Sequence, residues 1–235
     1  ALHCLNDTKT YGGIMQIHLS ENFTYKKLLQ FVFPSVMMMV FSSLYGIVDG
    51  LFVSNFVGKN AFAAVNFIMP FLMILGTLGF MLGTGGSAVV AKTLGEGKKE
   101  TANRHFSMLV YTTLILGTFF AAAGIIFIKP ITIMLGADEQ MLSDCVIYGT
   151  IILLALPFFM LQNVFQSFLV TAERPHLGLY VTIAAGVANM VLDFVLIVPL
   201  KMGVAGAALA TAASQTVGGV VPLLYFASKK NKSLL

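Results

Sequence analysis

Two carboxylates lie inside long apolar stretches of this sequence. Eight of the ten acidic residues lie in the ends of the chain, in connecting segments or near an expected helix end, but Asp49 lies in GIVDGLFVS and Asp193 in NMVLDFVLIV. An ionised carboxylate at the centre of a bilayer costs about 2.5–3.5 kcal/mol on insertion scales. Removal from water also favours the neutral form of a carboxyl group. We therefore expect both side chains to face a bundle interior, where they exchange a proton or bind a small cation.

Further oxygen donors accompany these acids. Asn189 lies four residues before Asp193, so the two side chains share one face of a helix. Their oxygens suit a hard cation, with the proton and Na+ as the two candidates, and the apolar runs hold no His or Cys cluster for zinc or copper. The alternative is that these side chains only bond neighbouring helices and hold the packing together. Polar candidates on two other expected helices are Asn163 and Thr211.

The elements that must position these residues are membrane-spanning helices. The chain has 235 residues, of which 57% are hydrophobic and 10% charged, and its mean hydropathy is +0.88, which is typical of a membrane protein. A span needs about 20 mostly apolar residues. Six segments qualify, namely 28–56, 61–91, 106–128, 141–170, 177–200 and 204–227. The sequence therefore predicts an all-α, polytopic bundle of six transmembrane helices.

The division of the chain follows from these spans. We predict a polar tail over 1–24, a six-helix transmembrane lobe over 25–228 and a basic cytoplasmic tail over 229–235. Residues 1–14 are unpatterned and receive no function, and a native start at Met15 is an alternative. Eleven of the fourteen Lys and Arg residues fall on the side of the amino terminus. Only Lys59, Lys129 and Lys201 fall on the other side, so both termini are expected in the cytoplasm.

Glycines and prolines in the spans indicate close packing and bending. Pro34, Pro70 and Pro157 each remove a helix hydrogen bond and favour a kink. Small residues recur at close-packing intervals. They are Gly46 with Gly50, Gly79 with Gly83, and the stretch GVAGAALATAAS.

Several classes of activity are not indicated. The serine of GTGGSA has no membrane histidine, a GxGD stretch and paired NPA loops are missing, and no GxxxxGK[ST] loop occurs. Cys4 and Cys145 match neither a zinc spacing nor a disulfide framework. The net charge of +4 comes without a basic stripe interleaved with aromatic residues, so nucleic acid is not an expected partner. We predict a protein that is not an enzyme and needs no cofactor beyond a coupling ion.

The sequence resembles the multidrug and toxic compound extrusion (MATE) transporters of the wider superfamily of polysaccharide exporters and lipid flippases. The resemblance runs from Tyr25 to the end of the chain, and looks closest to the bacterial branch with an acidic pair in its amino-terminal lobe. Its motifs are Pro34 with IVDGLFVSNFVG, then FQSFLVTAERP, NMVLD and GVAGAALATAASQ. Where family members commonly have an Arg and a Gly, this chain has Val170 and Glu173, so that loop receives no role.

The resemblance implies a fold, a site and an activity. The family fold has twelve helices in two lobes with the substrate cavity between them, so a second six-helix lobe, either a missing half or a paired chain, is the expected partner. The implied activity is antiport in a bacterial inner membrane, where a proton or Na+ drives export of organic, often cationic compounds. Pro34 would be the bending point of the first helix. The implied cation site comprises Asp49, Asn189 and Asp193, supported by Asn163 and Thr211.

Two other functions remain open at this point. A relative that exports a lipid-linked or polar metabolite would keep the fold. A lipid-linked sugar diphosphate would favour basic residues in the cavity, but the six predicted spans contain no Lys or Arg, so a drug-like cargo is preferred. A non-transporting membrane subunit or a vestigial half gene would keep the spans without the activity.

Overall fold

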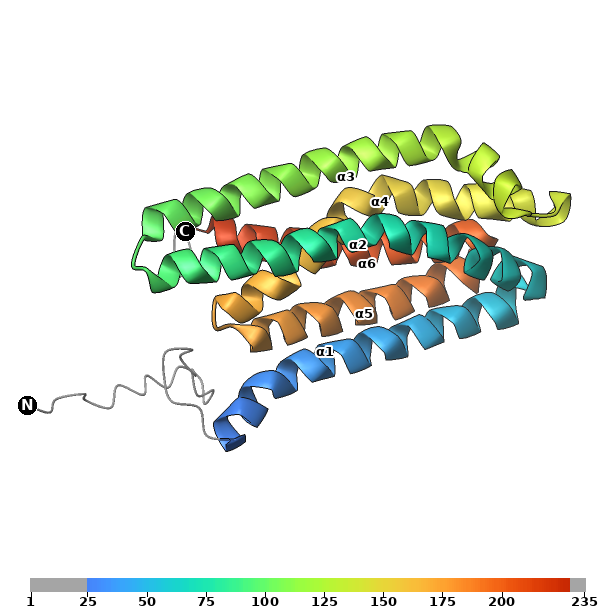
Figure 1. Ribbon diagram of the computed structural model, residues 1–235. Helices are drawn as coiled ribbons and strands as arrows, with labels where there is room; N and C mark the ends of the chain where they lie inside the picture. The colour runs from blue at the N-terminus through green and yellow to red at the C-terminus, as the bar shows by residue number, and fades with distance from the viewer. Residues whose placement is uncertain (1–24, 229–235) are drawn as a thin grey trace, which may run out of the picture.

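The structure is a computed structural model that describes residues 25–228. The predicted tails at 1–24 and 229–235, and Cys4 with them, lie outside the described residues. Six long helices alternate in direction along the chain, so that each runs antiparallel to the next (Figure 1). They are α1 (Tyr25–Phe52), α2 (Lys59–Gly95), α3 (Lys99–Leu135), α4 (Glu139–Thr171), α5 (Pro175–Ile197) and α6 (Gly203–Ala227), and a short π-helix, η1 (Val53–Val57), extends α1. All six are long and apolar enough to cross a membrane, which confirms the predicted fold class.

The helix ends differ from the predicted spans. Helices α2 and α3 each have 37 residues, about 55 Å at the α-helical rise, whereas a hydrocarbon core is about 30 Å thick. A span predicted from hydropathy ends at the first charged residues, but a helix continues until the backbone leaves the helical conformation. That change comes at glycines with positive φ, such as Gly97 (77°) after α2 and Gly136 (99°) after α3. The π-helix at the end of α1 was not predicted, because hydropathy does not distinguish one helical hydrogen-bond pattern from another.

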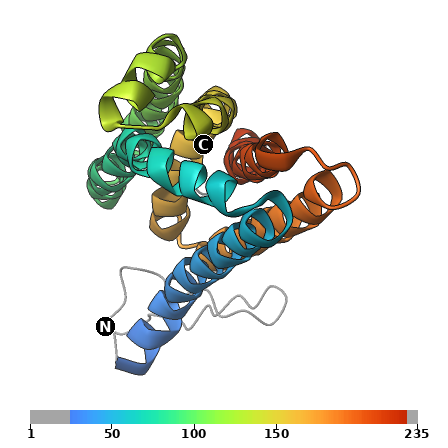
Figure 2. The same ribbon diagram turned by 90° about the vertical axis from the view of Figure 1, so that its right-hand side faces the viewer.

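Helix α4 lies at the centre of the bundle. It packs against α2, α3 and α6, while α5 packs against α6 and carries α1 on its other side. Viewed from the end, α1 and α5 lie side by side along one edge of the bundle, and α5 joins this pair to the rest mainly through α6 (Figure 2). Half of the apolar window of α4 is buried, compared with 11% for α1. Because α1 has so few neighbours, most of its surface is left for lipid or for another part of the protein.

Glycines bring the backbones close to α4. A Cβ on Gly79 of α2 would lie 2.6 Å from Met160 Cα, and one on Gly219 of α6 would lie 2.7 Å from the Phe158 carbonyl oxygen. A side chain at either position would therefore push the helices apart. The predicted packing role of Gly79 is confirmed, whereas the prediction for Gly46 is wrong. A Cβ at Gly46 would meet nothing within 4 Å, because that face of α1 has no neighbouring helix.

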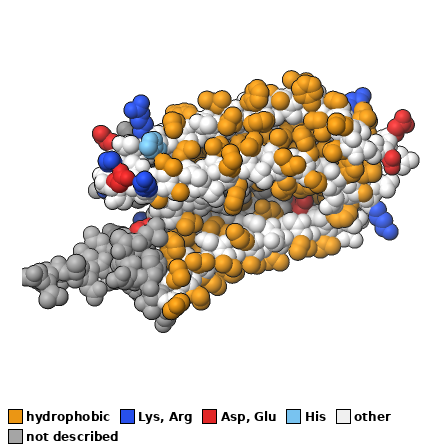
Figure 3. All heavy atoms as spheres, viewed as in Figure 1, with side chains coloured by type: hydrophobic (Ala, Val, Ile, Leu, Met, Phe, Trp, Pro, Cys, Tyr) orange, Lys and Arg blue, Asp and Glu red, His pale blue; other side chains and the backbone are white. Residues whose placement is uncertain are grey.

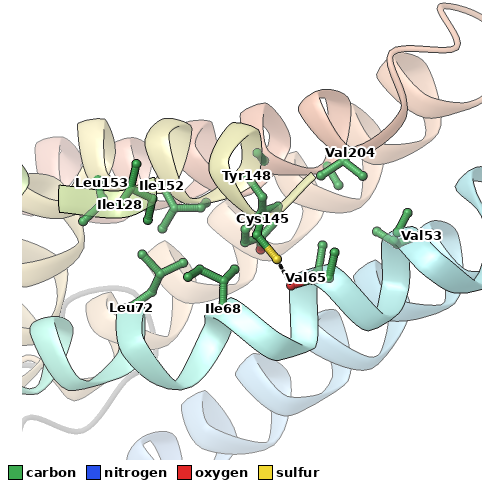
Figure 4. Packing of buried hydrophobic residues seen from close by; sticks show 14 of the residues in the cluster. Val53, Val65, Ile68, Leu72, Ile128, Cys145, Tyr148, Ile152, Leu153 and Val204 are labelled. Carbon is green, nitrogen blue, oxygen red and sulfur yellow. Dashed lines mark hydrogen bonds between the residues drawn. The ribbon is translucent and has the colours of Figure 1, made fainter. Parts of the chain in front are cut away.

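Apolar side chains fill the space between α2, α3, α4 and α6. Ile68 and Leu72 of α2 face Ile152 and Leu153 of α4, and Cys145 Sγ donates to the Ala64 carbonyl oxygen at 3.4 Å (Figure 4). A second cluster lies where α3 begins and α6 ends. It contains four phenylalanines, Phe106, Phe165, Phe168 and Phe226, with ring centroids 4.8–6.3 Å apart in the pairs that touch.

Charged side chains gather at the two ends of the bundle. Between these ends, the face seen in Figure 3 is a broad apolar band. The order of the helices puts Lys92, Lys98, Lys99, Arg104 and Arg174 at one end and Lys59, Lys129 and Lys201 at the other. The described cations are thus separated in the way that the predicted spans required.

Candidate functional site

Asp49 of α1 and Asp193 of α5 lie next to each other inside the bundle. Asp193 is wholly buried and Asp49 is 8% exposed. A hydrogen bond between two carboxyl groups needs a proton on one of them. Without a proton or a bound cation, two negative charges would face each other away from bulk water, which is costly. We refer to these two residues as the acid pair.

Local packing brings the acid pair together. Gly186 and Asn189 lie on the same face of α5 as Asp193, because all three are buried at intervals of three and four residues. On α1, Tyr45 lies one turn before Asp49, and its ring packs over Gly186. The absence of a side chain at Gly186 lets α1 approach α5 closely at this level.

Most side-chain oxygens of this site receive no hydrogen bond from the part of the chain that the structure describes. Both Asp193 carboxylate oxygens, Asp49 Oδ1 and Asn189 Oδ1 are buried and accept no hydrogen bond from the described residues. Some other buried polar groups of the bundle are satisfied locally, although Tyr148 Oη, His105 Nδ1, Gln162 Oε1 and Gln215 Oε1 also have no hydrogen-bond partner within residues 25–228. Thr113 and Thr132, for example, each donate to the carbonyl oxygen four residues earlier at 2.7 Å. A carboxylate can only accept, so a proton or a small cation is what would satisfy these oxygens.

Tyr148 of α4 is a member of this site that the sequence analysis missed. It is wholly buried, close to both carboxyl groups, and its hydroxyl lies beside Thr211 of α6. Thr211 thus lies near the acid pair. The available signal for Tyr148 was a phenol within the apolar run CVIYGTIILL, where its hydroxyl needs a polar neighbour.

Asn163 is not brought to the acid pair. It lies fifteen residues after Tyr148 on α4, about 20 Å along the helix. Its side chain instead lines an open groove between α1, α2 and α4, with a volume of about 500 Å³. The position implied for Asn163 by the resemblance is therefore corrected, because distance along α4 separates it from the acid pair.

The groove is neutral and mixed in character. Its walls combine thioether and aromatic side chains with hydroxyls and amides, including Met38, Ser42, Tyr45, Phe159, Gln162 and Gln166. No charged residue lines it among the described residues. Tyr45 belongs to the groove wall and lies one turn from Asp49, so the groove ends close to the acid pair. Pro34 is buried in α1 beside Ser35, at the far end of the groove, and the helix continues through it.

Known proteins share this arrangement. Residues 34–195 match the MatE family model. The "Multidrug export protein MepA" of Staphylococcus haemolyticus (strain JCSC1435) is 28% identical over 219 residues, which are 92% of this chain and 48% of that protein. The chain therefore spans about half the length of the curated relatives it matches.

Solved structures agree with this result. The crystal structure of a MATE protein in the bent conformation superposes with a TM-score of 0.82 at 26% identity, over 89% of this chain and 47% of that one. The straight conformation gives a TM-score of 0.82 at 25% identity, over 88% and 46%. Since the family model covers more than half of the sequence and includes the acid pair, the chain belongs to the MATE family of transporters, of which it matches one half.

Proposed function

We propose that this chain forms the amino-terminal lobe of an antiporter in a bacterial cell membrane, with both termini in the cytoplasm. A proton or Na+ moving inward drives the export of organic, often cationic compounds. The observation that carries the proposal is the buried acid pair with oxygens that have no donor, one helical turn from a neutral groove. The similarity to a protein named for multidrug export supports the class of cargo.

The acid pair supplies the coupling. Binding of a cation neutralises one of two adjacent buried charges, so the bundle favours a different packing of α1 on α5. The cation must bind the two conformations with different affinity, and moving a balance from 1:99 to 99:1 takes about 5.5 kcal/mol. In this proposal, the difference in cation affinity between the two conformations comes from four residues, namely Asp49, Asn189, Asp193 and Thr211. Pro34 allows α1 to bend.

The groove supplies the cargo site. Methionine and phenylalanine side chains adapt to different apolar surfaces, and the hydroxyls and amides between them bind polar groups of either sign. An anionic lipid-linked diphosphate would need Lys or Arg there. The neutral lining therefore favours amphipathic organic compounds as cargo.

A second six-helix lobe completes the transporter. Large apolar side chains of α1 are exposed along its whole length, including Leu29, Phe33, Met39, Leu44 and Ile47. The groove is open rather than enclosed, so another lobe is needed to enclose a substrate. The relatives are about twice the length of this chain, which supports a second half of similar size.

Substitution of the acid pair tests this function. Drug efflux is measured from cells or vesicles that contain the full gene product, under an imposed pH gradient and separately under an imposed Na+ gradient. Asp49→Asn and Asp193→Asn are expected to abolish the response to the driving gradient while binding of a fluorescent cationic dye persists. Asp138→Asn, at an exposed acid at the start of α4, is the control. Gradient-driven efflux that survives both substitutions overturns the proposal.

A further inference from the structure

A second pocket opens at the end of the bundle that carries few cations. Its volume is about 580 Å³, and it is separate from the groove. Its walls come from the turn between η1 and α2, from α4, and from the start of α6. They include Gly58, Lys59, Asp144, Ile147, Gly203 and Val204.

Two of the helices that wall this pocket, α4 and α6, also carry neighbours of the acid pair. Tyr148 lies four residues beyond Asp144 on α4, and Thr211 lies seven residues beyond Val204 on α6. At about 1.5 Å per residue these separations are about 6 Å and about 10 Å. By contrast, Asp193 lies eighteen residues from the start of α5 at the basic end, about 27 Å away. The pocket therefore lies closer to the acid pair than the basic end of the bundle does.

A thin apolar layer separates the pocket from the acid pair. Val53 lies one turn beyond Asp49, Ile197 one turn beyond Asp193, and Val204 at the pocket wall. Their exposed fractions are 1%, 3% and 5%. Val53, Val204 and Tyr148 lie in the same part of the core (Figure 4). Aliphatic side chains offer a cation no ligand, so they must move before an ion passes.

The pocket holds two charges of opposite sign. Asp144 is half-buried and Lys59 is exposed, and no ion pair within 4 Å joins these two described residues. A carboxylate in a confined cleft raises the local concentration of cations, and an ammonium group lowers it. The two side chains therefore have opposite effects on a cation that enters the pocket.

We propose that this pocket is the access route of the coupling cation, that Asp144 attracts the cation, and that Val53, Ile197 and Val204 form the barrier to the acid pair. The proposal rests on the proposed function, because the cation has a destination only if the acid pair binds it. It adds an entrance: the cation that moves inward reaches the acid pair through this pocket, at the end of the bundle opposite the basic loops.

Charge substitutions test the route. The quantity measured is the cation concentration, on the side of the pocket, that gives half-maximal drug efflux from proteoliposomes of the full gene product. Asp144→Asn is expected to raise this cation concentration by about threefold to fivefold. Lys59→Gln is expected to lower the same concentration by a similar factor. Asp138→Asn is the control, because it removes a negative charge from the same end of the bundle but outside the pocket. It is expected to change the cation concentration for half-maximal efflux by less than about twofold.

A labelling experiment tests the position of the route independently. Ala205→Cys places a thiol in the pocket wall, and Ser143→Cys places one on the exposed surface of α4 outside that wall. A cationic, membrane-impermeant methanethiosulfonate is expected to slow efflux for Ala205→Cys and to leave Ser143→Cys unchanged. The unsubstituted protein, in which Cys145 is buried, gives the background reaction.

The outcomes separate the two proposals. If the unsubstituted protein responds to the gradient, but each pocket variant behaves like its control, the access route is overturned and the proposed function stands. If the unsubstituted protein exports drug without regard to any cation gradient, the proposed function fails and the access route fails with it. If Asp144→Asn does not fold, Lys59→Gln and the labelling pair still decide the question.

Discussion

The ring of Tyr45 on α1 lies over Gly186 on α5, so that a Cβ at position 186 would be 3.0 Å from Tyr45 Cδ1. One turn beyond Tyr45 lies Asp49, and seven residues beyond Gly186 lies Asp193. The contact therefore fixes the separation of the two helices directly beside the acid pair. It also joins the groove to that pair, because Tyr45 is part of the groove wall.

Gly186→Val is expected to push Tyr45 aside and to separate α1 from α5 at the acid pair. A displacement that costs about 1 kcal/mol of cation binding raises the cation concentration for half-maximal efflux by about fivefold. The measurement is efflux against external cation concentration in proteoliposomes. Gly46→Val is the control, because a Cβ there meets nothing within 4 Å. Equal behaviour of the two variants would show that this contact does not set the geometry of the acid pair.

Tyr148→Phe removes one hydroxyl from the site and keeps the ring in the core. If that hydroxyl helps to bind the cation with Thr211, its loss is expected to weaken cation binding by about fivefold, the effect of about 1 kcal/mol. Cation-dependent protection against thermal unfolding measures the change. Tyr180→Phe, on the exposed face of α5, is the matched control. Protection that is the same in both variants would exclude Tyr148 from the cation site.

Asn163→Ala distinguishes a groove residue from a cation ligand. Because Asn163 lines the groove and lies about 20 Å along α4 from Tyr148, we expect the drug concentration for half-maximal transport to rise by about fivefold. The dependence of efflux on cation concentration is expected to stay unchanged. The opposite pattern, an altered cation dependence with normal drug affinity, would restore the role that the family resemblance implied.

Gly79→Ala and Gly85→Ala form a matched pair within α2. A Cβ at position 79 would lie 2.6 Å from Met160 Cα, a backbone atom that cannot move alone, so the free energy of unfolding is expected to fall by about 1–3 kcal/mol. A Cβ at position 85 meets nothing within 4 Å, and that variant is expected to keep or gain up to about 1 kcal/mol. Unfolding in mixed detergent micelles measures both. Equal losses would mean that α2 and α4 do not approach as closely as described.

Features that depend on residue type alone were predicted from the sequence. Six apolar runs, two carboxylates inside them, and a shared helix face for Asn189 and Asp193 follow from composition and helical periodicity. Whether an exposed face such as that around Gly46 has a neighbour depends on the other helices. The same is true of Tyr148, whose polar neighbours come from three other helices.

The sequence by itself determined that this protein spans a membrane six times and carries two acids where water is scarce, because hydropathy and spacing are properties of the chain. Only the tertiary structure decided that Asp49 meets Asp193, that Tyr148 joins them and that Asn163 does not. The rotation of each helix about its axis and its choice of neighbours are set by how closely backbones approach at residues such as Gly79 and Gly186.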